Sequence, residues 1–160
     1  MNKLLKIAAY LIGAVVLLLI CAIAFLQLGF PKVDPAPELS LEYTPDRIER
    51  GAYLANHVTV CMGCHSTRDF SEFSGPPTPG TLGTGGDVFD HSMGLPGVFY
   101  AKNITPHGIS DYTDGELYRL ITTGVTNDGR PMFPLMPYTY YGKMDPEDIY
   151  DIIAYVRSLP

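Results

Sequence analysis

The chain has 160 residues, about the length of one domain, which excludes most multi-domain architectures. Its formal net charge is −6 at pH 7, yet Lys3 and Lys6 are the only charged residues among the first 30. The remaining 130 residues carry nine Lys and Arg and all 17 Asp and Glu, a formal charge of −8. This balance excludes a basic nucleic-acid binder, because phosphate contacts need clustered Lys and Arg.

The N-terminal segment is uncharged from Ile7 to Leu26. Twenty residues at about 1.5 Å each span about 30 Å, the thickness of a bilayer's hydrocarbon core. The two lysines before this segment predict a cytoplasmic N-terminus, with the rest of the chain on the outer, periplasmic face of the cytoplasmic membrane. The alternative is a cleaved secretory signal, since Ala22-Ile23-Ala24 resembles a cleavage site. A signal core is usually about 7–15 residues long, so the apolar length favours a transmembrane helix.

We expect three parts along the chain. Residues 1–30 form the membrane anchor, residues 31–43 form a proline-containing linker, and residues 44–160 form one domain. The prolines of the linker favour an extended, semi-rigid spacer.

Capping signals and apolar spacing predict three helices in the domain. Thr44-Pro45 is typical of an N-cap followed by a first-turn proline, and this helix should run towards Val60. Thr113 begins a capping box, and Gly124 is the expected end of that helix. The last helix begins at Asp145-Pro146, and its apolar residues recur at helical spacing. No segment shows the alternation of a strand, so the predicted class is all-α with long loops.

These helices bury little apolar surface by themselves. Residues 74–86 consist almost entirely of Gly, Pro, Ser and Thr. A chain of this kind needs a further source of core, such as a metal, disulfides or a bound cofactor.

Cys61-Met62-Gly63-Cys64-His65 matches the C-x-x-C-H pattern of c-type haem attachment. Its spacing lets two thiols add to the vinyl groups on one edge of the porphyrin while the adjoining histidine ligates the iron. A thioredoxin-like redox pair would need a βαβ context, and a zinc site would need further ligands. A disulfide would leave His65 unexplained. We therefore predict one covalent haem c, with His65 as an iron ligand.

With this motif, residues 44–160 resemble the membrane-anchored monohaem c-type cytochromes of class I. Gly51–Ala55 and Ile153–Pro160 are similar to the family's first and last helices, which would cross at Gly51 and Tyr155. Asn103–Pro106 and Phe133–Tyr138 look most like haem domains in the cytochrome c subunits of bacterial membrane dehydrogenases. The resemblance implies the class I cytochrome c fold.

Met136 is the predicted second iron ligand. Pro134 and Pro137 restrain its backbone, and it matches the family's position. Met132, after Pro131, is the alternative. The other candidates for the second iron ligand are Met93, Met144, His57, His91 and His107.

The resemblance also suggests neighbours of the haem. A family Gly-Pro pair, here Gly75-Pro76, would supply the carbonyl that orients His65. Asn103 and Arg130 are candidates for propionate contacts. Tyr138, Tyr140 and Tyr141 would wall the pocket.

The predicted function is single-electron transfer rather than enzymatic catalysis. Iron held by His65 and Met136 has no open position for a substrate, and Met/His ligation raises the reduction potential. The expected redox partners are a membrane dehydrogenase, a quinol-oxidising complex or a terminal oxidase. The alternative is a haem enzyme or gas sensor with an open or displaceable sixth position, similar to a peroxidase.

Overall fold

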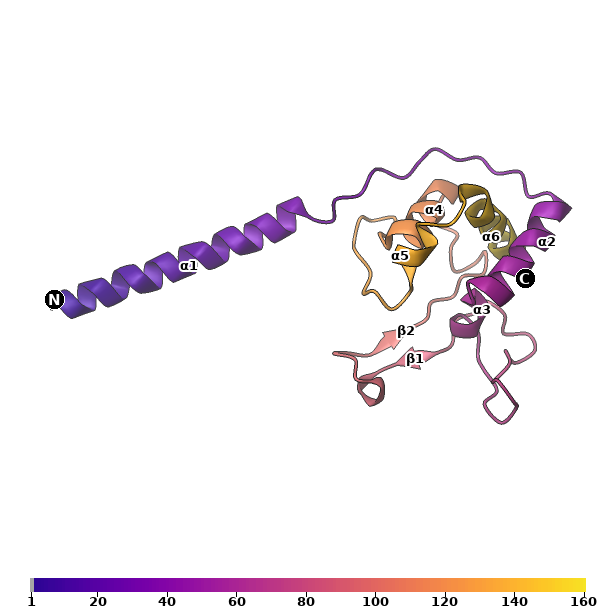
Figure 1. Ribbon diagram of the computed structural model, residues 1–160, viewed down its shortest axis with the longest axis horizontal. Helices are drawn as coiled ribbons and strands as arrows, with labels where there is room; N and C mark the ends of the chain where they lie inside the picture. The colour runs from indigo at the N-terminus through magenta and orange to yellow at the C-terminus, as the bar shows by residue number, and fades with distance from the viewer. Residues whose placement is uncertain (1) are drawn as a thin grey trace. The chain divides into compact units, whose positions relative to one another are not determined.

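The computed structural model describes residues 2–160 and is mostly helical (Figure 1). The chain divides into two compact units, the first ending at Asp34 and the second spanning Pro35–Pro160. In chain order the elements are α1 (Lys3–Gly29), α2 (Pro45–Tyr53), a π-helical turn η1 (Leu54–Val58), α3 (Cys61–Cys64), β1 (Val88–Phe89), a 3-10 turn η2 (His91–Met93), β2 (Phe99–Tyr100), α4 (Asp114–Thr123), α5 (Tyr138–Tyr141) and α6 (Pro146–Ser158).

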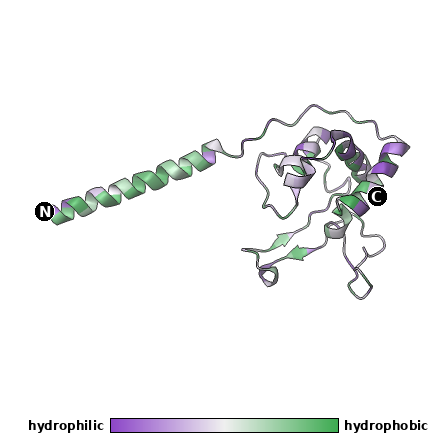
Figure 2. Ribbon diagram, viewed as in Figure 1, coloured by the Kyte–Doolittle hydropathy of each residue, from purple (hydrophilic) through white to green (hydrophobic). Residues whose placement is uncertain are grey.

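The first unit contains one 27-residue helix, α1. Figure 2 shows that it is apolar along most of its length. Within residues 2–160 it is the one helix whose length and composition suit a membrane crossing, and a signal sequence near an N-terminus would share both properties.

The three predicted helices of the domain are confirmed, with their caps. Thr44 caps α2, its side chain accepting a hydrogen bond from the backbone N–H of Arg47. Thr113 and Glu116 form the reciprocal capping box of α4, and Gly124 ends that helix in the left-handed conformation. Asp145 caps α6 through the backbone N–H of Glu147.

The core lies where α6 packs against α2 and η1, as expected from the resemblance. Gly51 of α2 is the crossing residue. A Cβ atom at this position would lie 1.9 Å from the carbonyl oxygen of Asp151 and 2.9 Å from Cβ of Tyr155. The two helices can approach this closely because glycine has no side chain. The buried core residues are Leu54, Ala55, Met62, Ile109, Leu117, Ile149, Ile152, Ile153, Val156 and Leu159.

Gly51→Ala should destabilise the domain although alanine is the better helix former. The propensity gain is about 1 kcal/mol, whereas forcing α2 and α6 apart at a backbone contact should cost more, as overpacked cores do. We expect the thermal unfolding midpoint to fall by roughly 5–15 °C. Gly97→Ala is the control, because its Cβ would meet only the Phe99 ring at 3.7 Å. A raised midpoint for Gly51→Ala would contradict the close crossing.

A small antiparallel hairpin, β1–β2, is absent from the sequence-based all-α prediction, as are the short elements α3, η2 and α5. Val88 pairs with Tyr100 and Phe89 pairs with Phe99. The ring of Phe99 also stacks on that of Phe133, with centroids 4.5 Å apart. Two residues per strand are too few to give a detectable alternation in the sequence.

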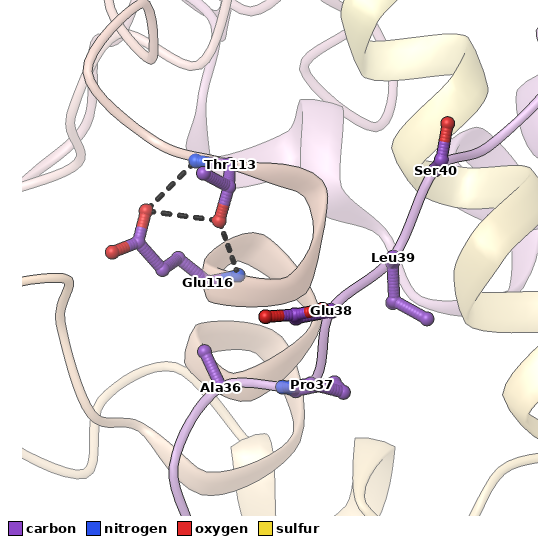
Figure 3. Close-up of a pocket in the computed structure, with 7 residues that line it drawn as sticks. All are labelled: Ala36, Pro37, Glu38, Leu39, Ser40, Thr113 and Glu116. Atoms are coloured by element: carbon purple, nitrogen blue, oxygen red, sulfur yellow. Dashed lines mark hydrogen bonds between the residues drawn. The ribbon is translucent and has the colours of Figure 1, made fainter.

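Residues 36–43 lie on the domain rather than away from it. Figure 3 shows Ala36–Ser40 running alongside the first turn of α4, where they line a pocket with Thr113 and Glu116. Gly115 permits this approach, because a Cβ there would lie 1.7 Å from the carbonyl oxygen of Pro37. Leu41 packs against the core, and the Tyr43 hydroxyl donates to Asp114 at 2.8 Å.

Candidate haem-binding site

Both motif cysteines lie on the single turn of α3. They are three residues apart, so a helix with about 3.6 residues per turn places them on one face. Both thiols are free; Cys61 is half-buried and Cys64 is exposed. His65 ends the turn, and its backbone N–H donates to the Cys61 carbonyl at 2.9 Å. The motif is therefore compact, with two thiols and an imidazole presented by five consecutive residues.

The environment of the thiols is unlike that of a reactive dithiol. Burial raises the pKa of Cys61, and burial together with the negative charge of Asp87 raises the pKa of Cys64. Catalytic redox pairs instead lower a cysteine pKa, which populates the thiolate near neutral pH. These cysteines do not have the electrostatics of a thioredoxin-like site.

The His65 ring is held by a backbone carbonyl. Its Nδ1 lies 2.7 Å from the carbonyl oxygen of Lys102. A carbonyl can only accept, so Nδ1 carries the proton and Nε2 keeps its lone pair for a metal. Burial lowers the pKa of His65, which favours the neutral form that can act as a ligand.

The prediction that Gly75-Pro76 orients His65 was wrong. The Gly75 carbonyl accepts a hydrogen bond from Arg68 Nε at 2.6 Å, and Asp69 N–H donates to the Pro76 carbonyl. The loop after Arg68 therefore closes on itself. Lys102, 37 residues after His65, supplies the carbonyl instead.

Residues 83–87 explain how Lys102 reaches the histidine. This segment hydrogen-bonds residues 64–66 on one side and residues 101–104 on the other, so three distant stretches form one layer. Gly86 must be small, because its Cβ would lie 2.4 Å from the Ser66 carbonyl oxygen. The bonds are Gly85 N–H to His65 O (2.9 Å), Asp87 N–H to Cys64 O (3.4 Å), Gly83 N–H to Ser66 Oγ (3.2 Å), Gly86 N–H to Ala101 O (3.4 Å), Ala101 N–H to Asp87 O (3.0 Å) and Ile104 N–H to Gly83 O (2.7 Å).

The donor set fits a c-type haem. Such a haem needs two thiols for its vinyl groups and an imidazole nitrogen for its iron. Cys61 and Cys64 offer the thiols on one face of a turn, and His65 offers Nε2 while Nδ1 is fixed by a carbonyl. A hydrogen bond from the imidazole nitrogen that does not bind the metal commonly orients a histidine ligand in this way.

Met136 lies on the loop between α4 and α5 and is half-buried. Its carbonyl accepts from the Tyr138 backbone N–H at 2.8 Å, where α5 begins. Met132 lies at the base of the same loop, where its N–H donates to the Gly124 carbonyl at 2.8 Å. The loop thus carries both methionine candidates, and the choice between them stays a prediction.

The other candidate iron ligands lie on other elements of the domain. Met93 and His91 belong to η2, where both are exposed. The His57 ring is exposed and lies 5.5 Å from that of Tyr53. His107 is exposed, and Met144 packs against the core.

Three contacts around the motif were missing from the sequence-based prediction. They are the Lys102 carbonyl at His65, a 3.1 Å approach of Thr59 Oγ1 to Cys61 Sγ, and a hydrogen bond from the Tyr141 hydroxyl to the Thr59 carbonyl at 2.6 Å. Two of them use backbone carbonyls, which carry no side-chain signature. Tyr141 was expected only as a wall of the pocket.

No protein-family model matches the chain, but curated proteins do. It is 32% identical over 114 residues to the fructose dehydrogenase cytochrome subunit of Gluconobacter japonicus, covering 69% of this chain and 21% of that protein. It is 33% identical over 112 residues to the gluconate 2-dehydrogenase cytochrome c subunit of Pantoea cypripedii, covering 68% and 22%. A diheme cytochrome c-type protein of Cereibacter sphaeroides is 29% identical over 154 residues, covering 94% and 48%.

The chain spans about a fifth of the first two relatives and about half of the third. Homology to cytochromes c implies a class I cytochrome c fold and covalent haem c, and both agree with the helical domain and the donor set of α3. This chain contains a cytochrome c domain that resembles the cytochrome c subunits of bacterial membrane dehydrogenases.

Proposed function

We propose that the chain is a single-electron carrier with one covalent haem c, ligated by His65 and Met136. The observation that carries the proposal is the fixed imidazole of His65, whose Nδ1 lies 2.7 Å from the Lys102 carbonyl beside two free thiols on one turn. The haem supplies the one-electron couple, and the protein supplies the ligands, the orientation and the exclusion of water.

Each residue of the proposed site has a separate role in holding the haem. Cys61 and Cys64 would attach the haem through thioethers. His65 would bind its iron through Nε2, with the hydrogen bond from Nδ1 to the Lys102 carbonyl holding the imidazole in place. Met136 would supply the second iron ligand, which would leave no position for a substrate. Such a site transfers electrons and does not bind oxygen or peroxide.

We further propose that α1 anchors the carrier in the cytoplasmic membrane as a single pass, with its N-terminus in the cytoplasm and the haem domain on the periplasmic face. Lys3 before the apolar run supports this orientation. The redox partners would then be membrane enzymes: a dehydrogenase, a quinol-oxidising complex or a terminal oxidase. The relatives' names, which include fructose and gluconate 2-dehydrogenase subunits, favour a dehydrogenase as the electron donor.

The net charge of residues 31–160 predicts that the rate of electron transfer to a partner depends on salt concentration. Residues 31–160 carry a formal charge of −8, so their field should steer the domain towards basic surfaces. We expect the rate at which respiratory membranes oxidise the reduced, detergent-solubilised full chain to fall several-fold as ionic strength rises from about 0.01 to 0.15 M, because the Debye length shortens from about 30 to 8 Å.

Stopped-flow absorbance of the haem measures this rate. Oxidation of the reduced chain by a small uncharged oxidant at the same salt concentrations is the control for effects on the haem itself. A rate that is flat with salt would argue for a permanently bound subunit with an apolar interface. A haem that no respiratory membrane oxidises or reduces would eliminate electron transfer as the function.

A further inference from the structure

Tyr141 links the loop that carries Met136 to the segment that begins the haem motif. It is the last residue of α5, four residues after Pro137. Its hydroxyl donates to the Thr59 carbonyl at 2.6 Å, across 82 residues of chain. The next residue but one after Thr59 is Cys61. This hydrogen bond therefore joins the helix that follows Met136 to the segment just before the haem motif.

The Thr59 end of this link is rigid. Thr59 is buried, with 7% of its surface exposed, and both its N–H and its hydroxyl donate to the Leu54 carbonyl, at 2.9 and 3.0 Å. Its Oγ1 also lies 3.1 Å from Cys61 Sγ. The carbonyl that Tyr141 uses thus belongs to a residue locked onto η1 and in contact with the first attachment cysteine.

The α5 end is coupled to Met136 through short backbone bonds. The Tyr138 N–H donates to the Met136 carbonyl at 2.8 Å, and the Tyr141 N–H donates to the Pro137 carbonyl at 3.2 Å. A four-residue helix has little stability of its own, since helix nucleation is unfavourable. Its position, and that of the methionine before it, therefore depends on tertiary contacts such as the one that Tyr141 makes.

Packing of Tyr141 against the hydrophobic core does not by itself require its hydroxyl group. Tyr141 packs against the core cluster, a role that phenylalanine could fill. Burial raises the pKa of Tyr141, so its hydroxyl stays protonated and donates throughout the physiological range. The neighbouring Tyr140, which we expected from the sequence in the pocket wall, is instead 72% exposed, and its ring lies near the Lys143 ammonium.

We infer that Tyr141 is a positioning residue for the second axial ligand: its hydrogen bond to the Thr59 carbonyl holds α5 and Met136 against the haem-attachment segment. The inference rests on the proposed His65/Met136 ligation. It predicts that losing the hydroxyl lets the methionine leave the iron more often while the haem stays attached through both cysteines.

Tyr141→Phe in the full-length holoprotein tests this inference, with Tyr140→Phe as the matched control. One hydrogen bond shifts an equilibrium by about fivefold, so carbon monoxide, which binds only when the methionine is off, should bind reduced Tyr141→Phe about five times faster than wild type. The red charge-transfer band of methionine-ligated ferric haem should weaken in the same variant. Tyr140→Phe should match wild type in both measurements.

A background of Met136→Ala separates positioning from general loosening. There the iron is already open, so adding Tyr141→Phe should leave the carbon monoxide rate unchanged. The inference is overturned if Tyr141→Phe behaves like Tyr140→Phe, or if it raises the rate equally in the Met136→Ala background. If wild type already binds carbon monoxide as fast as Met136→Ala, the proposed ligation fails, and this inference falls with it.

A measurement on wild type does not depend on any variant folding. Because this hydrogen bond joins α5 to Thr59, the hydrogen-bonded amides of Tyr140 and Tyr141 should resist hydrogen exchange to about the same extent as that of Thr59. Exchange at Tyr140 and Tyr141 more than tenfold faster than at Thr59 would overturn the inference.

Discussion

Replacing both Cys61 and Cys64 with alanine should leave the chain without covalently attached haem. These are the two thiols that the α3 turn places beside His65. We also expect the porphyrin to contribute to a hydrophobic core that is otherwise small. Haem-dependent peroxidase staining after a denaturing gel should fall to background. Each single variant keeps one thioether and should retain a reduced signal. The double variant should also lose most of its folded population, measured by proteolysis.

Cys21→Ala is the matched control, because this third cysteine lies exposed on α1 and outside the motif. It should stain like wild type. Haem that is extracted into acidified acetone from the intact wild-type protein would contradict covalent attachment. A double alanine variant that remains stained and folded would assign the haem to other residues.

The helices could be predicted because their signals are local. Thr44, Thr113 and Asp145 each cap a helix within three residues of themselves, and the apolar spacing of α6 requires no knowledge of its neighbour. The crossing at Gly51 came from the family resemblance, and the contact with Asp151 supplies its physical reason. The three residues that the sequence predicts to attach and ligate the haem belong to one pentapeptide.

The remainder depends on contacts between segments far apart in the chain. The Lys102 carbonyl reaches His65 only because residues 83–87 pair on both sides, and a backbone carbonyl is the same in every residue type. Residues 74–86 contain almost no apolar side chains. Gly83 and Gly86 nevertheless allow residues 83–87 to pack closely against neighbouring segments, because neither has a side chain. Composition indicates that a loop exists, but it does not indicate what the loop packs against.

Met136→Ala should open the sixth position of the iron and lower the reduction potential. Methionine stabilises ferrous haem relative to other ligand sets, and axial ligands move haem potentials over about 0.8 V, so a fall of at least about 0.1 V is expected. Reduced Met136→Ala should bind carbon monoxide rapidly and completely, whereas wild type should bind it slowly. Potentiometric titration and flash photolysis measure the two effects.

Met132→Ala provides the comparison, because Met132 lies on the same loop and is also half-buried. Its backbone N–H, which alanine retains, already pairs with the Gly124 carbonyl, so the base of the loop should persist and the potential should stay near that of wild type. The reverse pattern, an open iron in Met132→Ala and an unchanged one in Met136→Ala, would make Met132 the ligand. No change in either variant would favour a histidine, and His91 and His107 would then be the next residues to replace, because both are exposed and lie outside the α-helices.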